Sequence, residues 1–259
     1  MIETTLVLVC KRPILGIGKQ RLAASLGVEM TQRVAKALLA CALEDASNWS
    51  GPVVIAPANP LDYQWAQTLS AQILSPVTVL PQVFGNLGQR LNALDQALRR
   101  KKLKQLVFIG SDAPGLCETD YAAVKDSLQC HDTVLIPAVD GGVVLMASRK
   151  EWPDMTDLPW STNQLGTALV KSCRTAGHYV TKLEQSYDVD EPNDLAKLVD
   201  KLALDRRPAR RVLHQLVYSI ISTRFTDVFK QNIGEWKVSY SKLIFRIIFC
   251  TLELGRIES

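Results

Sequence analysis

Short apolar runs and longer amphipathic segments alternate along most of the chain. Four runs rich in β-branched and aliphatic residues predict buried strands at 5–10, 52–56, 105–109 and 133–137. Weaker patterns predict further strands at 72–74, 143–147 and 178–183. Apolar residues at helical spacing predict helices over 29–46, 63–69, 86–100, 118–128, 163–175 and 192–204. This alternation is typical of βαβ units, so we expect an α/β fold of three layers around a mostly parallel, Rossmann-like sheet.

A change of composition near residue 205 predicts a domain boundary. From Arg206 onward the chain has ten Lys and Arg residues against four Asp and Glu, although its overall net charge is only +4. We therefore expect one domain over residues 1–204 and a basic, helical C-terminal extension over residues 205–259. Such an extension can dock another protein, an anionic membrane surface or nucleic acid, but basic amphipathic helices are more often solvated or packed on their own domain. We expect no nucleic-acid partner.

The composition also excludes several classes of protein. The six cysteines are scattered and form no CxxC pair, which argues against a zinc site or a disulfide framework. The N-terminus lacks the basic start and long apolar segment of a signal peptide. The longest apolar candidate for a membrane span, 243–254, is interrupted by Arg246 and Glu253. We expect a cytoplasmic protein without a transmembrane segment.

A basic loop with two glycines follows the first predicted strand. Gly16 and Gly18 let the backbone bend around a ligand. Lys11, Lys19 and Arg21 place positive charge at the sheet edge where open α/β sheets bind ligands. The loop fits neither the Walker pattern nor GxGxxG, and a solvated basic loop is the alternative. Its position favours phosphate binding.

The predicted strand at 105–109 runs directly into Gly110, Ser111 and Asp112. A carboxylate at the end of a buried strand can hold a divalent cation, and such a cation bridges phosphate oxygens. The alternative is an Asx turn before Pro114, in which Asp112 caps the following helix.

Asp140 ends another predicted strand and is followed by Gly141 and Gly142. The glycines permit close approach of a substrate, and Asp140 can orient sugar hydroxyls or act as a base. An Asp-Gly hairpin turn gives the same residues and is the more frequent meaning of this pattern.

Asp188 and Asp190 alternate along an extended segment, so their side chains point to one side. One of them can complete a metal site with Asp112. Asp190 can equally cap the helix that Pro192 begins.

Two smaller motifs precede predicted helices. Gln82 and the segment 85–90 resemble a glycine loop that opens a helix, whose N-terminus can face an anion. Trp160, Ser161 and Thr162 can form part of the site, or can simply be a buried tryptophan followed by a helix cap.

In chain order, these motifs resemble those of a bacterial family of uncharacterised or arsenosugar-associated glycosyltransferases with the GT-A, or nucleotide-diphospho-sugar transferase, fold. The likeness covers about residues 7–198 and extends more distantly to the phospholactate and molybdenum-cofactor guanylyltransferases. The matching segments are 11–22, 81–90, 110–114, 137–145, 160–162 and 188–195.

The resemblance implies roles for particular residues. Lys11, Lys19 and Arg21 are expected to contact the donor phosphates. Asp112, with Asp190 as a second ligand, is expected to bind a divalent metal such as Mg²⁺ or Mn²⁺. Further site residues are implied: Gly16, Gln82, Gly88, Arg90 and Ser111 for the nucleotide, and Asp140, Gly141, Gly142, Trp160, Ser161 and Thr162 for the transferred group or acceptor.

The leading hypothesis is a metal-dependent glycosyltransferase that moves a sugar from a nucleotide-diphosphate donor to a small acceptor, with Asp112 and Asp140 as its catalytic carboxylates. The alternative is a nucleotidyltransferase that joins an NTP to a phosphorylated small molecule. A third hypothesis is a non-catalytic nucleotide-binding protein, because Gln20 replaces the family's usual threonine and Val143-Val144 replace its aromatic pair. The donor's base and sugar, the acceptor and the oligomeric state stay open.

Overall fold

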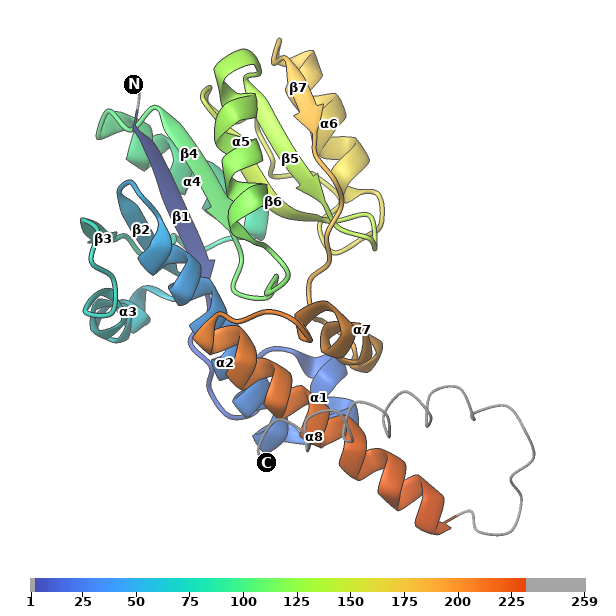
Figure 1. Cartoon of the computed structure of the whole chain (residues 1–259). Helices are drawn as coiled ribbons and strands as arrows, with labels where there is room; N and C mark the ends of the chain where they lie inside the picture. The colour runs from blue at the N-terminus through green and yellow to red at the C-terminus, as the bar shows by residue number, and fades with distance from the viewer. Residues whose placement is uncertain (1–2, 232–259) are drawn as a thin grey trace. The chain divides into compact units, whose positions relative to one another are not determined.

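The structure, a computed structural model, describes residues 3–231 of the 259-residue chain (Figure 1). The chain divides into two compact units, Met1–Tyr218 and Ser219–Ser259. The first unit contains the sheet and all the features discussed below. Within residues 3–231, no helix has the length and apolarity needed to cross a membrane.

A sheet of seven strands forms the centre of the first unit. The strands are β1 (Thr4–Cys10), β2 (Val53–Pro57), β3 (Val77–Val79), β4 (Gln105–Ile109), β5 (Thr133–Pro137), β6 (Val143–Ser148) and β7 (Val180–Lys182). Their order across the sheet is β3-β2-β1-β4-β6-β5-β7. Strand β6 runs antiparallel to β4 and β5, and the other neighbouring pairs are parallel. The predicted mostly parallel sheet is therefore confirmed.

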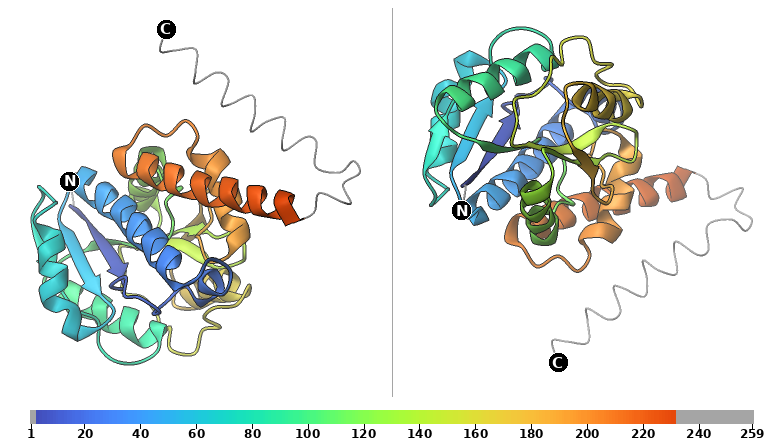
Figure 2. Two further views of the ribbon diagram at one scale, coloured as in Figure 1. Left: turned by 90° about the horizontal axis from the view of Figure 1, so that it is seen from below. Right: turned by 90° about the horizontal axis from the view of Figure 1, so that it is seen from above.

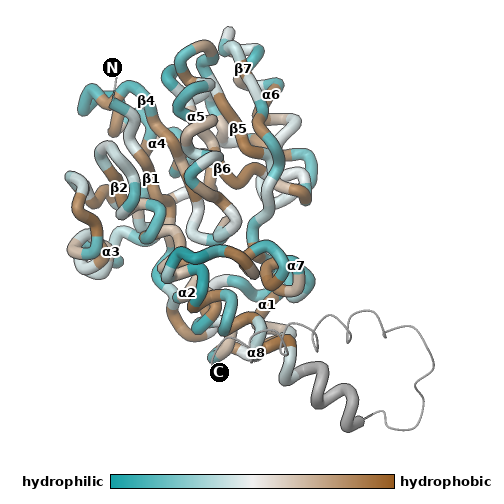
Figure 3. The backbone as a smooth tube through the Cα atoms, in the orientation of Figure 1, coloured by the Kyte–Doolittle hydropathy of each residue, from teal (hydrophilic) through white to brown (hydrophobic). Residues whose placement is uncertain are grey.

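Helices cover both faces of the sheet (Figure 2). One face carries α2 (Val28–Asn48), α3 (Tyr63–Ser70) and α5 (Glu118–Cys130), and the other carries α4 (Leu87–Arg100) and α6 (Leu165–Thr175). Because successive side chains of a strand point to opposite faces, Leu6 and Leu8 join the first layer of core and Val7 joins the second. The three-layer prediction is confirmed, and hydrophobic residues follow the central strands in Figure 3.

Four further helical segments complete the described chain. They are α1 (Gln20–Leu26), a 3₁₀ turn (Pro60–Asp62), α7 (Pro192–Leu202) and α8 (Pro208–Gln231). Helix α1 lies at the end of the loop that the sequence predicts to be basic and irregular. The strand predicted at 72–74 is wrong, because backbone amides of residues 72 and 73 still donate to Leu69 and Ser70 at the end of α3. The strand forms instead after Pro76, as β3.

The first compact unit includes residues 205–218, which the sequence assigns to the C-terminal extension. Charged side chains explain this difference. Arg210 is fully buried, and its guanidinium donates to Asp45 at 2.6 Å and to Glu44 at 3.0 Å. Arg207 donates to Asp45 at 3.1 Å, and the Tyr121 hydroxyl donates to the same carboxylate at 2.9 Å. We call these five residues the arginine network. The predicted helices beyond residue 231 lie outside the described residues.

Candidate active site

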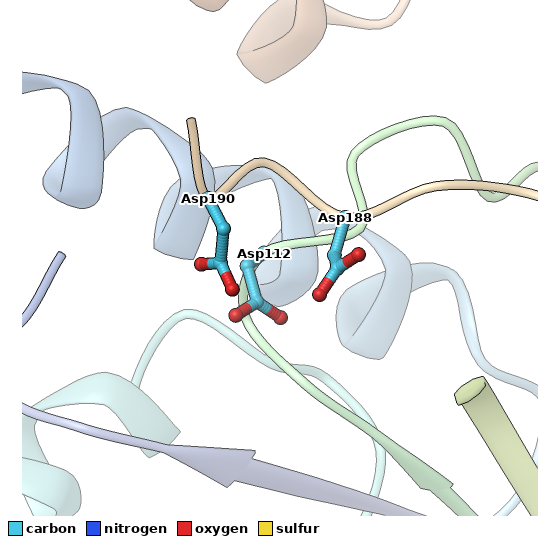
Figure 4. Close-up of side chains that lie close together, drawn as sticks. All are labelled: Asp112, Asp188 and Asp190. Atoms are coloured by element: carbon cyan, nitrogen blue, oxygen red, sulfur yellow. The ribbon is translucent and has the colours of Figure 1, made fainter. Parts of the chain in front are cut away.

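Three aspartates gather near the carboxyl end of β4 (Figure 4). Asp112 lies on the loop that follows β4, whereas Asp188 and Asp190 lie on the segment between β7 and α7. One carboxylate oxygen from each residue lies within 4.8 Å of the other two. Oxygens that share one divalent cation at about 2.0–2.6 Å can be separated by at most about 5 Å. The spacing therefore fits a common cation, and we call these three residues the carboxylate site.

Backbone contacts hold the two segments of the carboxylate site together. The Val189 amide donates to the Asp112 carbonyl at 2.9 Å, and the Val189 side chain is fully buried. Because side chains alternate along an extended segment, burying Val189 turns its two aspartate neighbours the other way. A Cβ at Gly110 would lie 2.5 Å from Asp112 Oδ1, so glycine leaves room for that carboxylate.

Neither Asp112 nor Asp190 is the N-cap of a helix. Cys117 is the N-cap of α5, and Glu191 is the N-cap of α7. The Asp194 carboxylate accepts from the backbone amides of Asp190 and Glu191, at 3.1 and 2.9 Å. The capping alternatives for Asp112 and Asp190 are therefore wrong.

Lys19 is the positive partner of the carboxylate site. Its ammonium lies 3.1 Å from Asp112 Oδ2 and 2.6 Å from Asp190 Oδ1, and it also donates to the Val189 carbonyl at 2.6 Å. Burial by itself would lower the pKa of Lys19, but Asp112 and Asp190 outweigh that effect and raise its pKa above the ordinary value. The sequence predicts that Lys19 contacts the donor phosphates. In this structure it is a charged ammonium held by carboxylates.

The third carboxylate of the site, Asp188, is not paired with Lys19. Burial, followed by repulsion from Asp112, Asp190 and Asp140, raises the pKa of Asp188 to about 6. The Lys19 ammonium pairs with two of the three carboxylates, so negative charge is in excess. An excess of closely spaced carboxylates attracts a divalent cation.

The other basic residues of the first loop lie at the surface. Lys11 is exposed, and Arg21 is exposed and pairs with Glu191 at 3.1 Å. Gly16 has a φ of 74°, in the left-handed region that favours glycine. Ser111 is half-buried beside Asp112. These placements leave the loop's positive charge accessible to an incoming anion.

Asp140 lies in a tight connection between β5 and β6. Its Oδ1 accepts from the Gly142 amide at 2.9 Å, so the turn interpretation holds. Gly141 has a φ of 91°, and a Cβ there would collide with the Asn163 carbonyl. Asp140 is exposed and close enough to Asp188 to contribute to its raised pKa. The turn is thus compatible with a place at the rim of the site.

The remaining predicted residues lie in or just before α4 and α6. Gly88 has no room for a Cβ because of the Met155 carbonyl, which also accepts from Trp160 Nε1 at 2.9 Å. Gln82 is buried and donates to the Ala56 carbonyl at 2.7 Å. Gln82 Oε1 and Arg90 Nε are buried without a hydrogen-bond partner among the described residues. Two further residues, Ser161 and Thr162, are exposed.

A separate cavity of about 690 Å³ opens between α2, α3 and the first loop. Arg12, Lys36 and Trp65 contribute to its lining, together with aliphatic residues of α2. None of the three aspartates lines it. The cavity and the carboxylate site are therefore distinct features.

Comparison with solved structures identifies the class of fold. A protein from Desulfovibrio desulfuricans G20, provisionally described as a nucleotide-diphospho-sugar transferase, matches with a TM-score of 0.74 and 23% identity over 85% of this chain and 99% of that chain. A cytidylyltransferase from Leptospira borgpetersenii serovar Hardjo-bovis (strain JB197) matches with a TM-score of 0.50 and 11% identity over 92% of this chain and 100% of that chain. The fold is that of the nucleotide-diphospho-sugar transferases, as the sequence predicts.

The chain belongs to the bacterial family described as "Uncharacterized protein conserved in bacteria (DUF2064)", whose model matches residues 26–162. This match confirms the resemblance to a bacterial family with the nucleotide-diphospho-sugar transferase fold. No curated protein matches the chain.

Proposed function

We propose that this protein is a metal-dependent transferase that moves a sugar from a nucleotide-diphosphate donor to a small acceptor. The observation that carries the proposal is the convergence of Asp112, Asp188 and Asp190 within 4.8 Å near the carboxyl end of β4. Ligands of open α/β sheets bind at that end of the strands, and carboxylates there can anchor a diphosphate through a cation.

The chemistry of the site fits Mg²⁺ or Mn²⁺. All three donors are carboxylate oxygens, the ligands that hard divalent cations prefer. Asp112 and Asp190 are the proposed ligands, and Asp188 is a third candidate that the alternation with Asp190 already suggested. When bound, such a cation supplies positive charge that stabilises a departing diphosphate.

The chain's own residues supply the remaining roles. Lys11, Lys19 and Arg21 bring positive charge to the phosphates from the loop after β1. Asp140, on the connection between β5 and β6, is the proposed residue that orients the transferred group or, if the reaction inverts, accepts the acceptor's proton. The proposed partners are a nucleotide sugar and a small-molecule acceptor, and a cytoplasmic location stays a prediction.

A nucleotidyltransferase is the second candidate function. It would use the same carboxylate site but join an NTP to a phosphorylated small molecule and release pyrophosphate. The observation in its favour is the fold likeness to a cytidylyltransferase, which spans 92% of this chain.

A ligand screen followed by turnover assays tests the proposal. Thermal shift would be measured with nucleoside diphosphates, nucleotide sugars and NTPs, each with and without Mn²⁺. We expect the largest stabilisation from a nucleotide sugar with Mn²⁺, followed by release of the nucleoside diphosphate when acceptors are added. Pyrophosphate release from an NTP would instead favour the second function. Binding without turnover of any donor would favour a non-catalytic protein, the role that Gln20, Val143 and Val144 suggest.

A further inference from the structure

Lys19 lies between the carboxylates that the proposed function gives to a divalent cation. Its ammonium contacts Asp112 Oδ2 at 3.1 Å and Asp190 Oδ1 at 2.6 Å, while its side chain is only 15% exposed. A divalent cation bound to Asp112 and Asp190 therefore competes with Lys19 for the same two carboxylates. The Lys19 ammonium and a divalent cation cannot both bind these two carboxylates fully, because their positive charges repel each other at such short range.

The backbone at Lys19 indicates that these ion pairs hold the residue in place. Lys19 is in the left-handed region, at φ 47° and ψ 44°, which costs a residue other than glycine about 1–2 kcal/mol. Gly16 and Gly18 in the same loop also have positive φ angles, and no atom lies within 4 Å of a Cβ built on either. The loop is held by contacts of its other residues, among them the Lys19 ion pairs and the Gln32 side chain, which donates to the Pro13 carbonyl at 3.0 Å.

We propose that Lys19 is a displaceable internal counter-cation that couples metal binding to nucleotide binding. While the site is empty, Lys19 neutralises Asp112 and Asp190. When a divalent cation and a nucleotide diphosphate bind together, Lys19 leaves the carboxylates and turns to the phosphates. This inference rests on the proposed function, since it concerns the same site.

Two consequences follow for ligand affinity. A metal ion alone has to compete with Lys19 for the carboxylates, and a nucleotide alone finds Lys19 already engaged. Each ligand removes the obstacle to the other, because the metal ion releases the ammonium and the diphosphate accepts it. The two ligands should therefore bind cooperatively, with a coupling within the range of about 5–150-fold that is typical of linked sites.

Mn²⁺ titrations of the full chain, followed by the EPR signal of free Mn²⁺, test the inference. In the absence of nucleotide, Lys19→Met should bind Mn²⁺ about 5-fold or more tighter than wild type, because its carboxylates are uncompensated. At saturating Mn²⁺, the same variant should bind none of UDP, GDP and CDP better than wild type does. It should bind the nucleotide that wild type prefers about 10-fold more weakly, because a phosphate contact is lost. A residue with a purely structural role would not move the two affinities in opposite directions.

Three further variants serve as controls. Lys19→Gly removes the charge and relaxes the left-handed backbone, so it should give the same increase in Mn²⁺ affinity even if Lys19→Met folds poorly. Lys19→Arg keeps the charge and should bind Mn²⁺ about as wild type does. Lys36→Met removes an exposed lysine from α2 and should leave the Mn²⁺ affinity of the empty site unchanged.

The possible failures are distinguishable. If wild type binds Mn²⁺ and the uncharged Lys19 variants bind it equally or more weakly, the inference is overturned while the proposed function stands. If wild type binds no Mn²⁺ with or without any of the three nucleotides, the metal-dependent function fails, and the inference fails with it.

Discussion

The first compact unit holds two ionic clusters that are built differently. In the arginine network, Arg210 is fully buried and also donates to the Pro114 carbonyl at 3.3 Å, in addition to Asp45 and Glu44. Burial raises the pKa of Asp45, although Arg210 opposes that effect. In the carboxylate site, three half-buried aspartates lie together, and the Lys19 ammonium pairs with two of them, Asp112 and Asp190.

The basic side chain at the centre separates the structural cluster from the candidate functional one. A planar guanidinium with several donors fixes carboxylates and carbonyls in one geometry, whereas an ammonium on a flexible stem can exchange partners. In the arginine network, neighbouring groups of the same chain compensate the buried charges. The carboxylate site keeps an excess of negative charge within reach of solvent, which is an arrangement suited to a ligand.

The largest expected effect comes from breaking the arginine network. Arg210→Met leaves Asp45 buried with less compensation and should lower the free energy of unfolding by about 3–5 kcal/mol. Urea denaturation followed by circular dichroism measures the change. Arg211→Met, which removes an exposed charge on the same helix, should change it by less than about 0.5 kcal/mol. Equal effects of the two substitutions would contradict the structural role given to Arg210.

Asp112→Asn should have a large effect on ligand binding and a small effect on folding stability. Loss of this carboxylate should weaken Mn²⁺-dependent nucleotide binding by about 100-fold or more, while the melting temperature changes little. Isothermal titration calorimetry with Mn²⁺ and the preferred nucleotide provides the measurement. Asp126→Asn, an exposed position on α5, is the matched control. Full metal-dependent binding by the Asp112 variant would refute the site.

Asp188→Asn should raise the stability of the metal-free protein and lower its affinity for the metal ion. Removing its charge relieves repulsion by Asp112 and Asp190, so the metal-free protein should gain about 0.5–1 kcal/mol in its free energy of unfolding. Metal affinity should fall by about 10-fold, because one oxygen ligand is weakened. Unfolding and Mn²⁺ titrations on the same preparation test both signs. A loss of stability would mean that Asp188 has a structural partner in place of repulsive neighbours.

A smaller effect is expected at Asp132, which is buried and pairs with the more exposed Arg149 and Lys150. Burial raises its pKa, but the Tyr179 amide, Lys150 and Arg149 together hold the pKa of Asp132 well below its usual range. Because the pKa is depressed in the folded state, Asp132 stabilises the fold at pH values above its unfolded pKa of about 3.9. This stabilisation is lost as the pH falls from there towards the folded pKa. Asp132→Asn should cost about 1 kcal/mol near pH 7. The difference from wild type should shrink below about pH 4, and a pH-independent difference would exclude this origin.

Local sequence patterns predict much of the fold and of the candidate site. Strand β4 is a run of apolar residues that ends at Gly110, and the alternation of Asp188 and Asp190 predicts that their side chains point to one side. Both signals act over a few residues, where side-chain direction follows from backbone geometry. The parallel sheet then brings the ends of distant strands to one edge.

Long-range ion pairs could not be predicted in the same way. The partners Arg210 and Asp45 are 165 positions apart, and nothing in the residues around Arg210 distinguishes it from a solvated charge. Lys19 likewise contacts Asp112 and Asp190 across 93 and 171 positions of the chain. The shift of β3 to residues after Pro76 reflects the continuation of α3, where Ile73 is buried and Leu74 is exposed.

The carbonyls of Pro114 and Leu116, which accept from the arginine network, lie on the same loop as Asp112. A polypeptide ended at residue 204 would keep every strand of the sheet but lose both arginines, leaving Asp45 and these two carbonyls without those donors. The smallest version of this domain suitable for crystallisation or fragment screening therefore extends through Tyr218.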